Sequence, residues 1–313
     1  MNAFNGFLLV DKPPLCTSFN VVSLCRKVFD TQRVGHSGTL DPFATGLLII
    51  ATGEALKLLE YIPSEPKEYA GTAVLGASSS TYDCEGEITA SSTSDSVNKK
   101  VDLDMINKII QQKFLGKIMQ VPPAHSAIKV RGVPAYVRAR RGEDLSLPAR
   151  PSTIYEFEIT DFSYPRLSFR CQVSSGTYIR SLLHDLGQEL QVGAYLDTLR
   201  RTKIASFSVE QAVTVAELEQ YLLDRSDDTF LSSRLVPLEF AVSHFPRKDL
   251  TSLQYEKLAQ GLYIDLDPAD REFLSQEGNR VLPAFLDNRL VGVLEFTPTN
   301  QLKFHKKLNI PLS

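Results

Sequence analysis

The sequence mixes strand-like and helix-like segments without a regular strand–helix–strand repeat. Short apolar runs typical of strands lie at 6–10, 47–52, 69–75, 154–162 and 167–173. Apolar residues recur with helical spacing at 105–114 and 179–190, and after Thr17 and Ser18, which can cap a helix. A doubly wound parallel sheet requires the missing repeat, so the pattern favours an α+β fold.

The pattern of the sequence changes near residues 243–250, and we expect a second domain to begin there. Beyond it, short apolar segments at 263–266, 280–285 and 290–296 are separated by Gly, Asn and Asp turns. We therefore expect a catalytic domain at 1–242 and a small β-rich domain at 243–313. The polar stretch 84–102 has no periodicity and is predicted to be an exposed loop.

The composition bears on RNA binding, metal binding and cellular location. The formal net charge of -3 still permits RNA binding, because a local basic face can supply the phosphate contacts. The four cysteines (Cys16, Cys25, Cys84 and Cys171) are scattered and show no metal-ligand spacing. No signal peptide is recognisable, and no apolar run approaches the roughly 20 residues that span a bilayer. These features predict a soluble cytoplasmic protein without a metal site.

The most informative segment is the glycine-rich loop 35–46, GHSGTLDPFATG. Its three glycines permit backbone conformations closed to other residues and let a ligand approach closely. Asp41 precedes a proline, which restricts its backbone and fixes where its carboxylate points. A Leu-Asp-Pro sequence is otherwise an ordinary turn, and the loop lacks the ending of a P-loop.

Two further segments could complete a site around Asp41. Arg180 ends the sequence GTYIR; an arginine placed against Asp41 would lower the pKa of its carboxyl and keep it ionised, as a nucleophile requires. Tyr69 ends the sequence KEY at the start of a strand and could offer a face on which an unstacked base rests. The alternatives are a surface arginine and a tyrosine that packs in the core.

Together these segments resemble the TruB-type family of tRNA pseudouridine synthases. Seven motifs match in the family's order, at 6–13, 35–46, 67–69, 121–129, 135–142, 176–180 and 199–201. His125 and Ser37 depart from the usual tyrosine and threonine. The resemblance implies a pseudouridine-synthase fold with a mixed, largely antiparallel central sheet flanked by helices. It also implies a PUA-like C-terminal module.

The resemblance further implies a reaction and its residues. Uridine 55 in the T-loop of tRNA would be isomerised to pseudouridine by a monomer, without a cofactor, metal or protein partner. Asp41 would attack C1′ of the ribose or C6 of the base, Arg180 would orient Asp41, and Tyr69 would stack on the base. Tyr178 and Leu199 would line the uracil pocket. His36 would enter the space left by flipped nucleotides, or else only stabilise the loop.

RNA affinity is expected from phosphate contacts. Lys12, in the first motif, is predicted to bind substrate. A basic insertion near 121–150 resembles the family's RNA-gripping segment; its acidic residues are Glu143 and Asp144, and its basic residues are Lys129, Arg131, Arg138, Arg140, Arg141 and Arg150. The strongest binding candidates there are Lys129, Arg138, Arg140 and Arg141.

Three rival functions stay open at this point. A synthase of the same fold could depend on a guide RNA, although the short C-terminal module favours the stand-alone form. A tRNA-folding chaperone could use the same binding surface with catalysis secondary. A carboxylate-dependent glycosidase would need a second catalytic carboxyl, which the resemblance does not supply.

Overall fold

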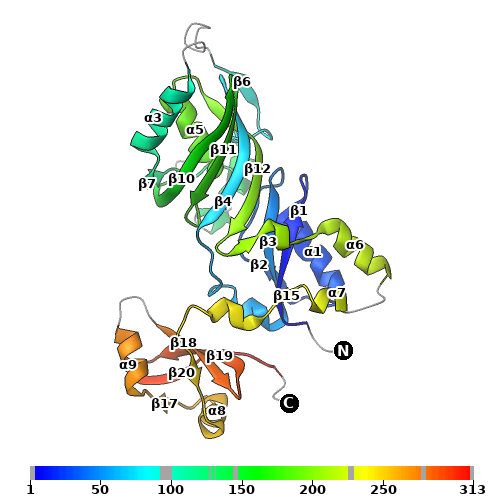
Figure 1. Ribbon diagram of the computed structural model, residues 1–313, viewed down its shortest axis with the longest axis vertical. Helices are drawn as coiled ribbons and strands as arrows, with labels where there is room; N and C mark the ends of the chain where they lie inside the picture. Colours follow the sequence, from blue (N-terminus) through cyan, green and yellow to red (C-terminus); the bar gives the residue numbers. More distant parts are fainter. Residues whose placement is uncertain are drawn as a thin grey trace.

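The computed structural model of the protein describes residues 4–91, 101–126, 128–130, 132–143, 147–224, 229–275 and 280–310. Figure 1 shows a long sheet with helices packed against it and, below it, a smaller β-rich unit that contains the C-terminal strands. Within this described part, no helix is long and apolar enough to cross a membrane.

The main sheet has 11 strands, and its main path runs β14–β1–β3–β12–β4–β11–β10–β7. Only the β1–β14 and β3–β12 pairs are parallel; the other pairings are antiparallel. The strands of this path are β1 (Gly6–Lys12), β3 (Thr45–Thr52), β4 (Lys67–Leu75), β7 (Gly116–Gln120), β10 (Arg150–Ser163), β11 (Arg166–Val173), β12 (Ala194–Ile204) and β14 (Val213–Thr214). Three short strands pair beside the path, namely β2 (Val34–His36), β13 (Phe207–Ser208) and β15 (Leu235–Val236).

Helices cover different parts of this sheet. Helices α3 (Leu103–Lys113) and α5 (Ile179–Glu189) share one core with β4, β10, β11 and β12. Helices α1 (Ser18–Val28) and α6 (Val215–Asp224) share another with β1 and β3. The remaining short elements are η1 (Gly53–Leu58), β5 (Ala77–Ser79), β6 (Ile88–Ala90), β8 (Lys129–Val130), β9 (Val133–Pro134), α4 (Ala135–Ala139), η2 (Val209–Gln211), α7 (Thr229–Ser232) and η3 (Leu238–Val242).

Helix α1 illustrates how local sequence sets an element that positions the site. Thr17 caps the helix, and its side chain and that of Asn20 form a reciprocal capping box. The buried stripe Val21, Val22, Cys25 and Val28 packs the helix onto the sheet. The helix predicted after Thr17 and Ser18 is confirmed, and its first turn lies against the loop of Asp41.

The C-terminal strands form a separate five-stranded sheet in the order β16–β18–β19–β20–β17. These strands are β16 (Lys248–Asp249), β17 (Ile264–Asp265), β18 (Val281–Leu286), β19 (Arg289–Phe296) and β20 (Gln301–Lys307); α8 (Ser252–Ala259) and α9 (Pro268–Ser275) accompany them. The sheet curls into a PUA-like half-barrel, as predicted. The boundary at 242/243 stays a prediction.

Buried contacts join the half-barrel to the main sheet. Glu54, 2% exposed, accepts a hydrogen bond from the Asn309 backbone N–H at 2.8 Å and pairs with Lys57, which donates to the Lys307 carbonyl at 2.7 Å. Apolar side chains of both sheets, such as Leu47 and Val293, belong to one buried cluster. The half-barrel therefore packs against the main sheet and η1 through a shared core.

Two segments illustrate where the structure departs from the sequence expectations. Strand β12 lies at the centre of the main sheet but was not predicted, because its sequence is rich in charged residues and two register shifts against β4 interrupt its alternation. The stretch 84–102, expected to be a loop, contains β6, which pairs with β5. Its residues 92–100 lie outside the described residues.

Candidate active site

The loop of Asp41 connects β2 to β3 and is held at several points. The Ser18 hydroxyl lies 2.9 Å from the Leu40 N–H, which donates to it, and 3.3 Å from the Leu40 carbonyl. The Ala44 N–H closes the turn by donating to the Asp41 carbonyl at 3.1 Å. Since Ser18 belongs to the first turn of α1, these hydrogen bonds fix the position of the loop relative to the helix.

Two buried cations hold the loop from behind. Lys12, 0% exposed, donates from Nζ to the carbonyls of Pro13, Cys16 and Pro42 at 3.1, 2.6 and 3.1 Å. Arg201, 1% exposed, donates from Nε to the Leu47 carbonyl at 2.7 Å and from Nη2 to the Gly38 carbonyl at 3.2 Å.

A glycine is required where the loop rejoins the sheet. Gly46 has φ +103°, and a Cβ there would lie 2.3 Å from the Arg201 carbonyl oxygen. The close approach of the two backbones brings the buried arginine against the loop.

Arg180 meets Asp41, as the sequence analysis anticipated. Its Nη2 donates to Asp41 Oδ1 at 3.0 Å, and its Nε lies 2.9 Å from Asp41 Oδ2. The Arg180 side chain is 6% exposed, whereas 32% of the Asp41 side chain remains exposed. The arginine is thus buried beneath a carboxylate that solvent can still reach.

A second acid contacts the same guanidinium. Nη1 of Arg180 lies 3.2 Å from Asp83 Oδ2 and donates to the Thr81 carbonyl at 3.2 Å, while Nη2 also donates to the His125 carbonyl at 3.0 Å. Asp83 is 2% exposed. Each of these contacts limits rotation of the guanidinium, so Asp41 is held by a group that is itself fixed from three sides.

The expected lowering of the Asp41 pKa is wrong. Burial raises the pKa of this carboxyl above its ordinary value and the nearby Asp83 charge raises it further, while Arg180 and Lys12 act in the opposite direction. The prediction counted only the arginine, because the sequence shows neither the burial of Asp41 nor the second carboxylate that shares the arginine.

Aromatic and aliphatic side chains adjoin the loop on the core side. Tyr69 of β4 and Leu199 of β12 are 7% and 6% exposed and share a buried cluster with Leu40 and Phe43 of the loop. Tyr178 is the N-cap of α5, half-buried, and its backbone N–H donates to Gln120 Oε1 at 2.8 Å. Burial raises the pKa of the Tyr178 phenol. The residues expected around the uracil therefore come from two strands, β4 and β12, and from the start of helix α5.

His36 lies at the end of β2 and stabilises the loop. Its Nδ1 accepts the Gly38 N–H at 3.2 Å, so the neutral ring carries its proton on Nε2. Burial and the Arg201 charge lower the pKa of His36. The loop-stabilising alternative is present in this structure, and a role toward flipped nucleotides stays a prediction.

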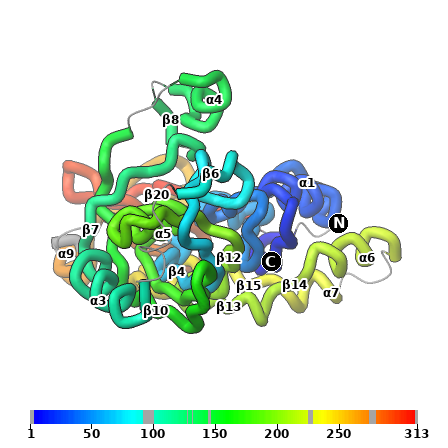
Figure 2. The backbone as a smooth tube through the Cα atoms, turned by 90° about the horizontal axis from the view of Figure 1, so that it is seen from above, coloured from blue at the N-terminus to red at the C-terminus, as the bar shows by residue number. Residues whose placement is uncertain are grey.

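The predicted RNA-binding cations do not share one environment. Lys12 is enclosed behind the loop, where its ammonium donates to backbone carbonyls, and its role in binding substrate stays a prediction. Figure 2 shows β8 and α4 projecting from the body of the protein. On this projection Lys129, Arg140 and Arg141 are exposed, whereas Arg138 is partly buried and pairs with Glu143 at 2.6 Å. Arg131 and Asp144 lie outside the described residues.

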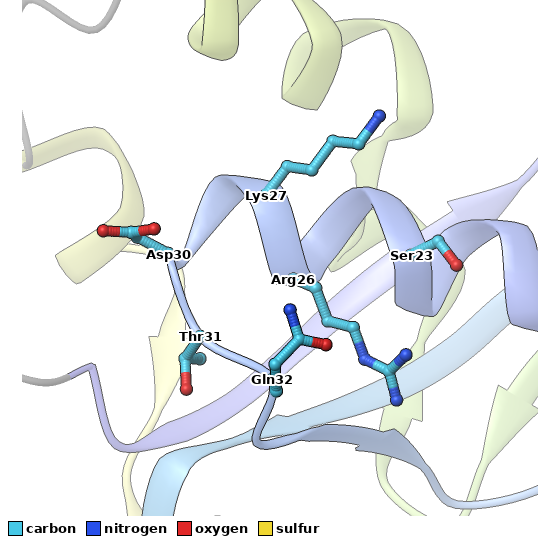
Figure 3. A pocket seen from close by; sticks show the side chains of 6 residues that line it. All are labelled: Ser23, Arg26, Lys27, Asp30, Thr31 and Gln32. Carbon is cyan, nitrogen blue, oxygen red and sulfur yellow. The ribbon is translucent and has the colours of Figure 1, made fainter.

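Other features of the surface are separate from Asp41. A hollow at the end of α1 contributes none of the predicted residues (Figure 3); it is lined by Ser23, Arg26, Lys27, Asp30, Thr31 and Gln32. Among the described residues, no group of three His, Cys, Asp or Glu side chains is placed to hold a metal ion.

Comparisons with known proteins agree with this geometry. Residues 26–179 match the profile described as TruB family pseudouridylate synthase (N terminal domain), and residues 180–243 match that of the tRNA pseudouridylate synthase B C-terminal domain. The tRNA pseudouridine synthase B of Dehalococcoides mccartyi is 40% identical over 267 residues, which cover 85% of this chain and 86% of the relative. The chain belongs to the TruB family of pseudouridylate synthases.

Further relatives support the same family. The tRNA pseudouridine synthase B of a Synechococcus strain is 42% identical over 268 residues, covering 84% of this chain and 86% of that protein. A crystal structure of a Cbf5-Nop10-Gar1 complex contains a chain of similar fold, with a TM-score of 0.67, 25% identity, and coverage of 94% of this chain and 79% of that one. The predicted family, α+β fold and enzyme class, an isomerase acting within one molecule, are confirmed.

Three polar residues of the site could not be identified from the sequence alone. Asp83 stands in a polar stretch whose residues resemble a solvent-exposed turn, and nothing in the sequence signals its burial. Arg201 was part of a matched motif but received no role of its own. Lys67 was noted only as the neighbour of Tyr69. Each gains its significance from contacts across the sheet.

Proposed function

We propose that this chain converts uridine 55 in the T-loop of tRNA to pseudouridine, with Asp41 as the nucleophile and without a cofactor. The observation that carries the proposal is the Asp41–Arg180 pair, in which a buried guanidinium orients a carboxylate that solvent still reaches. The names of the relatives support tRNA as the substrate, and the motif resemblance supports position 55.

The reaction exchanges one bond for another within a single nucleotide. The N1–C1′ bond breaks, the uracil turns, and C5 bonds to C1′; the C5 proton leaves and N1 takes up a proton. If Asp41 attacks C1′, it forms an ester to the ribose that the turned base displaces. If it attacks C6, the adduct forms on the base and the base migrates while attached.

The neighbouring residues would share the other tasks. Tyr69 and Leu199 lie beside the loop and would hold the apolar faces of the uracil. Arg180 would keep the carboxylate in one orientation, which reduces the entropy lost on reaching the transition state. The target must leave its stack in the folded T-loop, at a cost of a few kcal/mol. His36, at the edge of the loop, would occupy the space that the flipped nucleotides leave.

We place this reaction in the cytoplasm and assign it to a monomer that grips the T-stem-loop with its basic projection. Affinity would come mainly from phosphate contacts of Lys129, Arg140 and Arg141, which are exposed there.

Tritium release from uridine labelled at C5, in an unmodified tRNA transcript, tests the proposal directly. We expect release by the wild-type protein, none by Asp41→Asn, and none from a transcript with cytidine at position 55. Release that persists in Asp41→Asn would overturn the nucleophile, and release that persists with cytidine 55 would overturn the site.

Each rival function predicts a different result in the tritium-release experiment. Release that requires an added guide RNA would indicate a guided synthase. If the wild type releases no tritium but promotes tRNA folding, and Asp41→Asn promotes it equally, the protein is a chaperone.

A further inference from the structure

Lys67 is a lysine of the site that the mechanism above does not use. It stands two residues before Tyr69 on β4, so both side chains project from the same face of the strand. A Cβ on Gly38 would lie 3.5 Å from Lys67 Nζ, which places the ammonium directly beside the loop of Asp41. The lysine is only partly exposed.

No acid lies within ion-pair distance of this ammonium among the residues that the structure describes. The charge of Glu65 acts on Lys67 and raises its pKa, but the two carboxylate oxygens of Glu65 accept hydrogen bonds from the Ser175 N–H at 3.0 Å and the Tyr155 hydroxyl at 3.1 Å. Lys67 Nζ itself has no hydrogen-bond or ion-pair partner in the described part of the chain. A partly buried cation without a counter-ion indicates that an anion is to be supplied from outside.

Two further basic groups surround the same glycine. Arg201 donates to the Gly38 carbonyl, and within the described ranges no carboxylate lies within ion-pair distance of it. His36 accepts the Gly38 N–H. Burial, and after it the charge of Arg201, lowers the pKa of both His36 and Lys67; that of Lys67 falls to about 8, although Glu65 opposes the shift. Arg201, His36 and Lys67 therefore meet at Gly38, and among the described residues Lys67 Nζ has no hydrogen-bond partner.

We propose that Lys67, supported by the buried charge of Arg201, binds one phosphate group of the substrate RNA next to the target uridine. The inference rests on the proposed function and deepens it by naming the contact that seats the flipped nucleotide. A phosphate suits the site better than a neutral base oxygen, because only an anion compensates the charges of Arg201 and Lys67, which have no carboxylate in ion-pair contact within the described ranges. The ammonium would hold the backbone while Asp41 acts on the sugar or the base of the same nucleotide.

Equilibrium binding of a fluorescent T-stem-loop hairpin tests this contact without turnover. The protein carries Asp41→Asn throughout, and Lys67→Met is compared with Lys67→Arg and with Lys108→Met, a matched control on the exposed side of α3. We expect Lys67→Met to weaken binding roughly fivefold at 0.1 M salt and to reduce the slope of log affinity against log salt by roughly 0.7–0.9. Lys67→Arg and Lys108→Met should retain the full slope.

The pH dependence distinguishes an ionic contact from a structural one. The free lysine loses its proton as the pH rises through about 8. The affinity of the protein with Lys67 should then fall relative to that of Lys67→Arg, whose guanidinium stays charged. If the ratio of the two affinities is constant from pH 6.5 to 9.5, or Lys67→Met keeps the full salt slope, the proposal is wrong.

Neutral methylphosphonate linkages on either side of the target uridine identify the phosphate. At the contacted linkage the difference between Lys67 and Lys67→Met should vanish, since the anion is already missing. A difference that survives at every neighbouring linkage would overturn the assignment. Failure of the proposed reaction would be seen separately, as an absence of tritium release by the wild type while the hairpin still binds.

Discussion

The loop of Asp41 and the basic projection around α4 are both expected to touch the substrate, but they are built in opposite ways. The loop is pinned by buried groups, with Lys12 and Arg201 behind it and Arg180 beneath its carboxylate. On the projection, Lys129, Arg140 and Arg141 are exposed; Arg140 lies over the Tyr136 ring, 5.8 Å from its centroid.

This difference matches the demands on each region. A nucleophile must be held in one geometry, and buried hydrogen bonds supply that rigidity at the cost of desolvating charges. A phosphate backbone is gripped by charge at a surface, where exposed side chains can adjust. Substitutions in the loop should therefore change rate and stability, and substitutions in the projection should change affinity alone.

The largest effect is expected from Arg180→Lys. A lysine keeps the charge but cannot contact Asp41 and Asp83 together, so the single-turnover rate should fall by about 10²–10³-fold with saturating RNA. Arg166→Lys, at an exposed ion pair with Asp197, is the matched control and should leave the rate unchanged. If both variants behave alike, Arg180 does not orient the nucleophile.

Removing the cation behind the loop should reduce stability. Lys12→Met removes a buried ammonium that donates to three backbone carbonyls, and we expect the free energy of unfolding to fall by roughly 2–4 kcal/mol in urea titrations. Lys129→Met, on the exposed projection, should change it by less than about 0.5 kcal/mol. Equal stabilities of the two variants would remove the distinction between the two regions.

Much of this architecture could be predicted, and the failures share a cause. Apolar periodicity located β1, β4 and α5, and turn residues located the C-terminal strands, because these features are local. Strand β12 was missed because charged side chains interrupt its apolar alternation; one of them, Arg201, is buried through hydrogen bonds to the carbonyls of Leu47 and Gly38. Asp83 was missed for the same reason: its burial depends on Arg180, about a hundred residues away in the sequence. Long-range ion pairs leave no periodic signal.

Substitutions of the cations on the projection should weaken RNA binding to different degrees, depending on whether each cation already has an ion-pair partner. Arg140→Gln and Arg141→Gln should each weaken hairpin affinity roughly fivefold at 0.1 M salt, with the rate at saturating RNA unchanged. Arg138→Gln should have a smaller effect, because Glu143 already pairs with Arg138. Glu143→Gln frees that arginine and should strengthen binding. Fluorescence titrations across a salt series would contradict this ranking if Arg138→Gln were the most damaging.

The smallest effect is expected from Asp83→Asn, on the pH dependence of the reaction rate. Asp41 must be ionised to attack, so the rate should be full above its pKa and should fall as the pH drops through it. Burial and Asp83 raise that pKa above the ordinary 3.8, while Arg180 and Lys12 oppose them. Asp83→Asn removes the like charge. The pH at which the single-turnover rate falls on acidification should therefore be lower in this variant.

A control separates this shift from changes at a neighbouring acid. Glu85 also faces the pair, and burial together with the charges of Asp83 and Asp41 raises its pKa. Glu85→Gln should leave the acidic fall close to its wild-type position, because Glu85 does not contact Arg180. A larger shift in Glu85→Gln than in Asp83→Asn would mean that the acid beneath the guanidinium does not set the ionisation of the nucleophile. The fixed geometry of the loop would then stand without the electrostatic role that distinguishes it from the projection.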